Sequence, residues 1–213
     1  MVKVAIYSCN FGNYRKELKN YLSLKCDNNI DYFLFTDNKE IKLKNWNIIY
    51  TKILPGDEIM DGNRWTSKYI KFILPDILKS YDIIIWIDSK TINKPNIMTY
   101  DKVLNLLEKY PTTDVFNLKH PDRNTIQEEL VTTIKLKVEN KIPGQKFLKQ
   151  IKNFKSSFAL PDTTLIIRKN NKKINDIFEY CFELMKIYKL KRDQNIYNYA
   201  FDNKGVIPLV LSN

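Results

Sequence analysis

Apolar residues follow two different periods along this chain, and the two periods alternate. Short continuous or alternating apolar runs, typical of β-strands, occupy residues 2–8, 31–36, 46–51, 82–87, 114–120, 163–169 and the end of the chain. Amphipathic stretches with apolar residues three and four apart predict helices over 14–25, 62–80, 100–110, 125–137, 143–155, 174–190 and 192–201. Strands that alternate with helices predict an α/β layered fold with a mostly parallel central sheet.

The stretch from the helix predicted over 62–80 to the strand over 82–87 is the most informative. One face of the helix is apolar and carries Trp65, Tyr69, Phe72, Ile73 and Ile77. The strand is continuously apolar, which is the pattern of a parallel strand covered on both faces, and it stops abruptly at Asp88. Ligands bind beyond the carboxyl ends of the strands in open α/β sheets, so Asp88 is predicted to border a site.

Two cations, Arg64 and Lys68, are four residues apart and therefore share a face of the same predicted helix. Together they could clamp a diphosphate, or they could be two solvated charges on an outer face. The chain has neither a GxxxxGK(S/T) nor a GxGxxG motif, and it contains only five glycines. A phosphorylated ligand would therefore be held by side chains or a metal ion rather than by a glycine-rich loop.

Composition narrows the class of protein. A chain of 213 residues with 44% apolar content can form one large domain without disulfides or metals. Cys9, Cys26 and Cys181 are far apart in the sequence, which favours a reducing compartment over a zinc site. No apolar run approaches the roughly 18 residues of a membrane span, and the N-terminus predicts a strand rather than a signal peptide. We therefore expect a cytoplasmic protein without a transmembrane segment.

The net charge of +11 predicts an anionic partner, which could be nucleic acid, an anionic surface or a phosphorylated small molecule. Abundant Lys, Asn and Ile would also follow from an AT-rich genome, in which case part of the excess charge has no partner. No RNA-recognition, KH, helix-turn-helix or zinc-finger pattern is present, so a nucleic-acid partner is not expected.

Several blocks resemble, in the same order, those of GT-A-fold glycosyltransferases. RWTSKYIKFILPDILKSYDIIIWIDSK (64–90) is especially similar to the glycogenin-like family, in which a helix with an LPDLL-type end leads to a strand that closes in Asp-x-Asp. A poorly characterised group of glycosyltransferase-like proteins from plants and microbes is similar in the blocks VAIYSCNFGNYRKEL, DYFLFTDN, HPDRNTIQEE, LPDTTLIIR and RDQ. In length and composition the chain is also similar to the first domain of a larger chlorella-virus glycosyltransferase, which would place a viral protein in the host cytoplasm.

This resemblance implies a single GT-A-like catalytic domain over residues 1–213, a three-layer α/β sandwich that is complete or the N-terminal part of a longer chain. The implied reaction moves a hexose or deoxyhexose from a UDP-sugar to a hydroxyl of a glycan or glycoprotein, with retention and with divalent-metal assistance. Three groups of residues are implied to bind the donor: Ser8, Cys9 and Asn10 at the uridine; Thr36, Asp37 and Asn38 at the base or ribose; and Arg64, Lys68, Asp88, Ser89 and Lys90 at the diphosphate or donor sugar.

Asp88 matches the first Asp of the Asp-x-Asp motif, which in that fold holds a divalent cation, Mn²⁺ or Mg²⁺. Lys90 stands where the second Asp is expected, and an ammonium group there would repel the ion. Two arrangements remain open. Lys90 could turn away from an ion held by Asp88, substrate oxygens and water, which is the arrangement we expect. Alternatively, Lys90 could replace the ion as the charge that neutralises the leaving diphosphate.

Three further positions carry expectations about the sugar and the acceptor. Asp162, just before the strand at 163–169, is expected beside the acceptor hydroxyl or donor sugar, although it could be an ordinary turn residue. Asp193 and Gln194 resemble the pair that contacts the donor sugar in glycogenin-like retaining enzymes, and Asp193 could otherwise cap the last helix. His120, the only histidine, and Arg123 are expected to contact the acceptor or sugar.

Two rival classes remain open from the sequence. One is a basic module that binds nucleic acid, which the charge and the tyrosines would permit. The other is a catalytically silent carbohydrate-binding domain, which Lys90 suggests because it disrupts the Asp-x-Asp motif.

Overall fold

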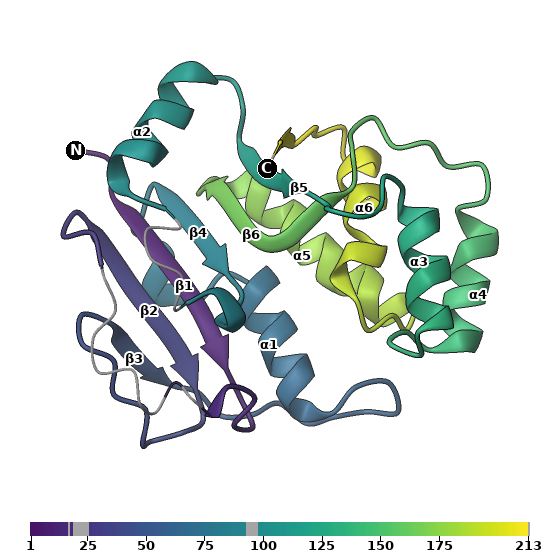
Figure 1. Ribbon diagram of the computed structural model, residues 1–213, viewed down its shortest axis with the longest axis horizontal. Helices are drawn as coiled ribbons and strands as arrows, with labels where there is room; N and C mark the ends of the chain where they lie inside the picture. The colour runs from purple at the N-terminus through teal and green to yellow at the C-terminus, as the bar shows by residue number, and fades with distance from the viewer. Residues whose placement is uncertain (17, 19–25, 93–97, 213) are drawn as a thin grey trace.

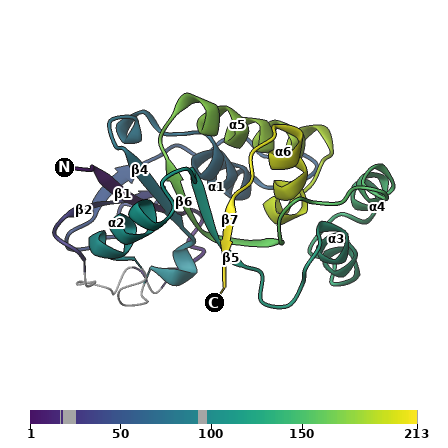
Figure 2. The ribbon, with the colours of Figure 1, turned by 90° about the horizontal axis from the view of Figure 1, so that it is seen from above.

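The computed structural model describes residues 1–16, 18, 26–92 and 98–212, and within them a seven-stranded sheet lies between layers of helices (Figures 1 and 2). Across the sheet the strands follow the order β3 (Asn47–Tyr50), β2 (Ile30–Thr36), β1 (Val4–Asn10), β4 (Ile83–Ile87), β6 (Pro161–Lys169), β5 (Val115–Lys119) and β7 (Leu209–Leu211). Four of the strand pairings are parallel, and β6 runs antiparallel to both of its neighbours. The predicted α/β fold with a mostly parallel sheet is confirmed.

Helices lie on both faces of the sheet. One face is covered by α1 (Gly62–Phe72), α5 (Lys172–Ile187) and α6 (Tyr197–Asn203), and the opposite face by α2 (Tyr100–Lys109) (Figure 2). The remaining helices, α3 (Ile126–Lys135) and α4 (Lys141–Gln150), pack against each other and stand to one side of the sheet. Within the described residues, no helix is both long enough and apolar enough to cross a membrane.

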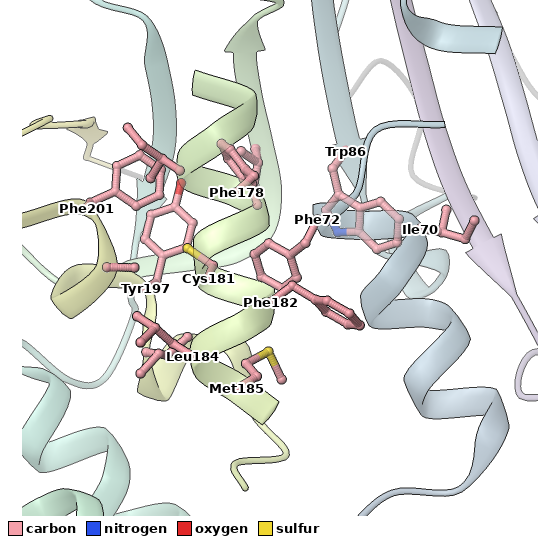
Figure 3. Close-up of a cluster of buried hydrophobic side chains, with 14 of the residues drawn as sticks. Ile70, Phe72, Trp86, Phe178, Cys181, Phe182, Leu184, Met185, Tyr197 and Phe201 are labelled. Atoms are coloured by element: carbon pink, nitrogen blue, oxygen red, sulfur yellow. The ribbon is translucent and has the colours of Figure 1, made fainter. Parts of the chain in front are cut away.

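The central strands are apolar throughout because alternate residues enter two different cores. Tyr7 of β1 and Trp86 of β4 point into the core under α1, α5 and α6, whereas Ile6 and Ile85 point into the core under α2. Figure 3 shows part of the first core, where Phe72 lies near Trp86 and the rings of Phe178, Phe182, Tyr197 and Phe201 come from α5 and α6. This alternation fixes which side chains reach the same face at the end of each strand.

The predicted helix over 62–80 is shorter in the structure, so that prediction was wrong in its extent. Helix α1 ends at Phe72, and Ile73 is already extended. Pro75 disfavours the α conformation in the residue before it, and a separate 3₁₀ turn, Asp76–Leu78, follows. This break turns the chain so that β4 can enter the sheet beside β1.

Other boundaries moved by smaller amounts. The predicted capping box of Thr125 and Glu128 is present at the start of α3. The helix predicted over 192–201 divides into a 3₁₀ turn, Asp193–Asn195, and α6, and no side chain caps α6. Asp193 therefore does not act as the N-cap that was its alternative role. Most of the helix predicted over 14–25 lies outside the described residues.

Candidate functional site

A cavity of about 510 Å³ lies at the carboxyl ends of β1 and β4, on the α1 side of the sheet. Cys9 and Trp86 contribute to its lining from the two strands, and α1 contributes a row of polar side chains. Among the described residues, the charged lining consists of two carboxylates, Asp61 and Asp88, and six basic side chains: Arg64, Lys68, Lys71, Lys90, Lys191 and Arg192. The excess of basic groups makes the cavity attractive to an anion.

Strand β4 and its alternation place Asp88 at this cavity. The Asp88 N–H donates to the carbonyl of Thr164 at 2.9 Å, which extends the pairing with β6 by one residue. Asp88 is two residues beyond Trp86 and so lies on the same face, where the indole Nε1–H donates to Asp88 Oδ1 at 2.9 Å. The carboxylate is about one-third exposed, at 34%. The structure thus brings Asp88 to the same cavity as Arg64 and Lys68.

Three basic residues form a stripe along α1, which we call the α1 basic stripe: Arg64, Lys68 and Lys71. The side chains are spaced four and three residues apart, so they follow one face from the solvent inwards. Their exposed fractions fall in that order, from 62% through 21% to 3%. Sequence reasoning found the first two members and missed the third, although its spacing from Lys68 was a usable signal.

Lys71 is the innermost member of the stripe and is held by several oxygens. Its Nζ donates to the carbonyl of Thr163 at 2.7 Å and to Asp193 Oδ2 at 2.5 Å, and it lies 3.9 Å from Asp88 Oδ1. The ammonium also lies 5.4 Å from the ring centre of Trp86. Burial alone would lower the pKa of Lys71, but the two carboxylates outweigh it and raise that pKa above its ordinary value. Lys71 is therefore a permanent cation at the cavity.

Asp193 is the anchor of the two inner lysines. Its Oδ1 accepts from Lys68 Nζ at 2.6 Å, and its Oδ2 accepts from Lys71 and, at 3.0 Å, from the hydroxyl of Thr163. Burial opposes ionisation, yet the two ammonium groups hold the pKa of Asp193 well below its ordinary value. Both carboxylate oxygens are thus engaged by protein groups, and Asp193 reaches the cavity only through the lysines that line it.

Two of the three predicted residues at the end of β1 line the cavity. Cys9 and Asn10 line the cavity, whereas Ser8 is fully buried and is not part of its lining. The Asn10 side chain bridges the backbone of Arg15, accepting from its N–H at 2.9 Å and donating to its carbonyl at 3.3 Å. Burial raises the pKa of the Cys9 thiol to about 12, so the thiol is uncharged where it lines the cavity.

Thr36, the last residue of β2, and the two residues after it do not line the cavity. The Thr36 hydroxyl donates to the Asn10 carbonyl at 2.6 Å and accepts from the Asn38 N–H at 3.1 Å. Asp37 accepts from the Gly12 N–H at 3.1 Å. Thr36, Asp37 and Asn38 therefore brace the loop that follows β1, and that loop lines the cavity.

Gly12 in this loop was not singled out from the sequence. Its φ of +61° is in the left-handed region that favours glycine, and a Cβ built on it would lie 2.4 Å from Asn63 Nδ2. Both Gly12 and Asn63 line the cavity, so the close approach of this loop to α1 sets the width of the cavity on that side.

His120 and Arg123 belong to a second charged cluster, which we call the Glu129 cluster. The fully buried Glu129 pairs with Arg123 Nε and, at 3.2 Å, with Arg192 Nε. His120 Nδ1 accepts from the Arg123 N–H at 3.1 Å, and Arg192 donates to Gln194 Oε1 at 2.5 Å. Burial and the nearby Arg123 charge lower the pKa of His120, so its imidazole is neutral at pH 7. Only Arg192 of this cluster lines the cavity.

Asp162 lies at the start of β6 and pairs in register with Leu118, next to an irregularity in the β5 pairing. Its Oδ1 accepts from the Thr164 N–H at 3.0 Å, and the side chain is partly exposed. Of the predicted site residues, the cavity brings together Cys9, Asn10, Arg64, Lys68, Asp88, Ser89 and Lys90. Those that do not line it are Ser8, Thr36, Asp37, Asn38, His120, Arg123, Asp162, Asp193 and Gln194.

The donor set at Asp88 does not fit a resident divalent cation. Mg²⁺ and Mn²⁺ are bound in proteins by oxygen ligands, and a neighbouring ammonium group repels them. Asp88 Oδ1 accepts from Trp86 and faces Lys71, Lys90 occupies the position of the second expected Asp, and Asp193 is neutralised by two lysines. Within the described part of the chain, no three His, Cys, Asp or Glu side chains come together as metal ligands.

Comparisons with known proteins bear on the fold. No protein-family model matches this chain, and no curated protein matches its sequence. Solved structures do match: WbbM, a bifunctional glycosyltransferase, has a TM-score of 0.56 and 13% identity over 99% of this chain and 39% of that chain. Mouse xyloside xylosyltransferase 1 has a TM-score of 0.53 and 9% identity over 99% of this chain and 85% of that chain.

Core-mannan synthase A from Aspergillus fumigatus, solved in its Mn/GDP form, has a TM-score of 0.50 and 11% identity over 94% of this chain and 70% of that chain. With the strand order and the helical layers, these likenesses define the chain as an α/β protein of GT-A-like, Rossmann-type fold. The chain spans 39% of the length of WbbM, the first of these structures.

Proposed function

We propose that this protein is a nucleotide-sugar-dependent glycosyltransferase that moves a hexose or deoxyhexose from a UDP-sugar to a hydroxyl of a glycan or glycoprotein. The observation that carries the proposal is the cavity at the ends of β1 and β4, which is lined by Asp88 and by six basic side chains. The GT-A-like fold supports it, because WbbM and mouse xyloside xylosyltransferase 1 are glycosyltransferases by name, and core-mannan synthase A was solved in a Mn/GDP form.

The proposed donor lies with its uridine near Cys9 and Asn10 and its diphosphate along the α1 basic stripe. Tyr14, which is 72% exposed and lines the cavity, offers an aromatic face to the base. Thr36, Asp37 and Asn38 act on the base or ribose through the loop that they brace. A cavity of about 510 Å³ is within the range of small-molecule sites.

In the proposed reaction, the bond between the anomeric carbon and the diphosphate oxygen breaks, and its electron pair leaves with the diphosphate. The oxygen of an acceptor hydroxyl bonds to the anomeric carbon and gives its proton to the departing diphosphate. The transition state resembles an oxocarbenium ion, so the main demand on the protein is to stabilise the departing negative charge. Arg64 and Lys68 supply that charge in the proposal. The divalent cation implied by the resemblance is left out, because the donor set at Asp88 does not fit it.

The remaining predicted residues keep roles on the sugar and acceptor side in this proposal. Asp162 is proposed to face the acceptor hydroxyl or donor sugar. Asp193, through Lys68 and Lys71, and Gln194, through Arg192, are proposed to order the donor sugar, with retention of configuration as their glycogenin-like pattern implies. His120 and Arg123 act indirectly on the acceptor end of the site: Arg123 pairs with Glu129, and Glu129 in turn holds Arg192, which lines the cavity.

Calorimetry and a hydrolysis screen test this function. The protein should bind UDP, and one member of a panel of UDP-, GDP- and CDP-sugars should be hydrolysed slowly without acceptor. Arg64→Ala should impair hydrolysis, because it removes one of the charges that stabilise the leaving diphosphate, and Lys149→Ala, a change at an exposed lysine on α4 outside the cavity lining, should leave it unchanged. Absence of both nucleotide binding and hydrolysis across the panel would rule the proposal out.

A further inference from the structure

We propose that Lys71 and Lys90 supply the positive charge on the donor diphosphate that a divalent cation would otherwise supply, so that nucleotide binding needs no metal. This inference rests on the proposed function. In this inference Lys71 binds the diphosphate, and Asp193 holds Lys71 in position.

The first observation is the set of hydrogen bonds made by Lys71. An ammonium group has three N–H donors. Two are used at short distance, on the Thr163 carbonyl at 2.7 Å and on Asp193 at 2.5 Å. The next carboxylate oxygen among the described residues, Asp88 Oδ1, is 3.9 Å away and beyond hydrogen-bond range. Because Lys71 lines the cavity, one N–H is left for an anionic ligand there.

The second observation is that this ammonium is fixed before any ligand arrives. Lys71 is only 3% exposed, and its surroundings hold it from three sides: Asp193, Thr163 and the Trp86 ring. A charge that is already oriented costs little reorganisation when negative charge develops on the leaving group. In the same way, a bound metal ion provides a positioned charge.

The third observation is the charge balance at the end of β4. A divalent cation on two carboxylates would carry a net formal charge of zero before the diphosphate binds. Here the two carboxylates Asp88 and Asp193 are accompanied by three lysines, Lys68, Lys71 and Lys90, which gives a net formal charge of +1. Lys90 lies in the 3₁₀ turn Ser89–Thr91, which Thr91 ties to the Asp88 carbonyl through its hydroxyl at 2.6 Å. The position of the missing second Asp is thus occupied by a cation at the cavity.

The test is calorimetric titration of the wild-type protein with UDP, once in EDTA and once in Mn²⁺, with uridine as a ligand that lacks phosphate. We expect the UDP affinity to agree within about twofold between the two buffers, because the charges on the diphosphate belong to the protein. UDP binding that is abolished by EDTA and restored by Mn²⁺ would overturn the inference and leave the proposed function standing. No binding in either buffer would overturn both.

Variants at Lys90 and at Lys71 test which side chains supply the positive charge on the diphosphate. Lys90→Ala should weaken UDP binding in EDTA by about tenfold and leave uridine binding unchanged, whereas the matched control Lys149→Ala should change neither. Because Lys90 is exposed, this variant is expected to fold. Lys71→Met combined with Asp193→Asn removes the buried cation with its partner carboxylate, and it should weaken UDP binding about tenfold to hundredfold. Unchanged UDP affinity in the Lys90 variant or in the folded double variant would overturn the assignment.

Lys90→Asp provides the sharpest variant. It restores the Asp-x-Asp pattern and removes one cation, so UDP binding should fall in EDTA and be recovered by Mn²⁺. A variant that binds UDP in EDTA as tightly as the wild-type protein would contradict the proposed role of Lys90.

Discussion

Two buried carboxylates, Asp193 and Glu129, are each neutralised by two basic side chains. They differ in how many of those side chains line the cavity. Lys68 and Lys71 hold Asp193, and both lysines line the cavity. Arg123 and Arg192 hold Glu129, and only Arg192 reaches the cavity. A lysine that pairs with one carboxylate still has donors to offer, whereas these guanidinium groups bridge several segments of the chain. The lysine cluster is thus suited to a ligand and the arginine cluster to structure.

The largest effect on stability is expected at Glu129. Glu129→Ala removes a fully buried carboxylate and leaves Arg123 and Arg192 without their shared partner. The free energy of unfolding should fall by about 3–5 kcal/mol in denaturant titrations. The exposed neighbour Glu128, which takes part in a capping box, is the control, and its change to Ala should cost only about 1 kcal/mol. Equal losses for the two variants would show that the Glu129 cluster is not structural.

Asp193→Asn should have a smaller effect on stability, about 2–3 kcal/mol, because Lys68 keeps some access to water. The variant should also respond differently to acid. The pKa of Asp193 is depressed by folding, so its contribution is present above the ordinary Asp pKa near 3.9 and is lost as pH falls through the folded value. The wild-type protein should therefore lose more stability below about pH 4 than the variant. Parallel stability curves in acid would contradict this linkage.

Gly12→Ala tests the loop that follows β1 and lines the cavity. The new Cβ would meet the Asn63 side chain at a position with φ of +61°, so we expect a cost of about 1–2 kcal/mol in thermal or chemical unfolding. Gly205, whose φ is +63° with no neighbouring atom near a built Cβ, is the matched control for backbone strain alone. A loss at Gly12 no greater than that at Gly205 would show that the contact with Asn63 is unimportant.

The smallest effect is expected at His120. Folding lowers its pKa, so the unfolded chain binds a proton more readily and stability should fall as pH drops below the ordinary His pKa near 6.5. His120→Gln should flatten this part of the stability curve by about 1 kcal/mol or less. A variant that keeps the full wild-type slope between pH 7 and pH 5 would indicate that another group titrates there.

The sequence predicted the parts of this site that depend on local pattern. The continuous apolar run of β4 and its alternation with Trp86 were enough to place Asp88 at the end of a central strand. Helical spacing was enough to place Arg64 and Lys68 on one face. Lys71, three residues after Lys68, lies on the same helix face, but a lysine is rarely buried, and its burial depends on Asp193, 122 residues further along the chain.

Contacts between distant segments account for what the sequence did not predict. Glu129 shares the buried face of α3 with Ile126 and Leu130, whereas Glu128 caps the helix, so helical spacing already separates the two carboxylates. The pairing of Glu129 with Arg192 across 63 residues is what no local pattern indicates. The end of α1 at Phe72 was predictable in principle from Pro75, since a proline restricts the residue before it.

Nucleotide binding without a metal depends most on the proposed contact between a nucleoside diphosphate and the inner end of the α1 basic stripe. The most direct measurement is a structure of the protein with UDP bound in the presence of EDTA. We predict a phosphate oxygen within hydrogen-bond distance of Lys71 Nζ, with Lys90 turned towards the diphosphate. A diphosphate seated away from Lys71 and Asp88, or one that is ordered only when Mn²⁺ replaces EDTA, would contradict the account.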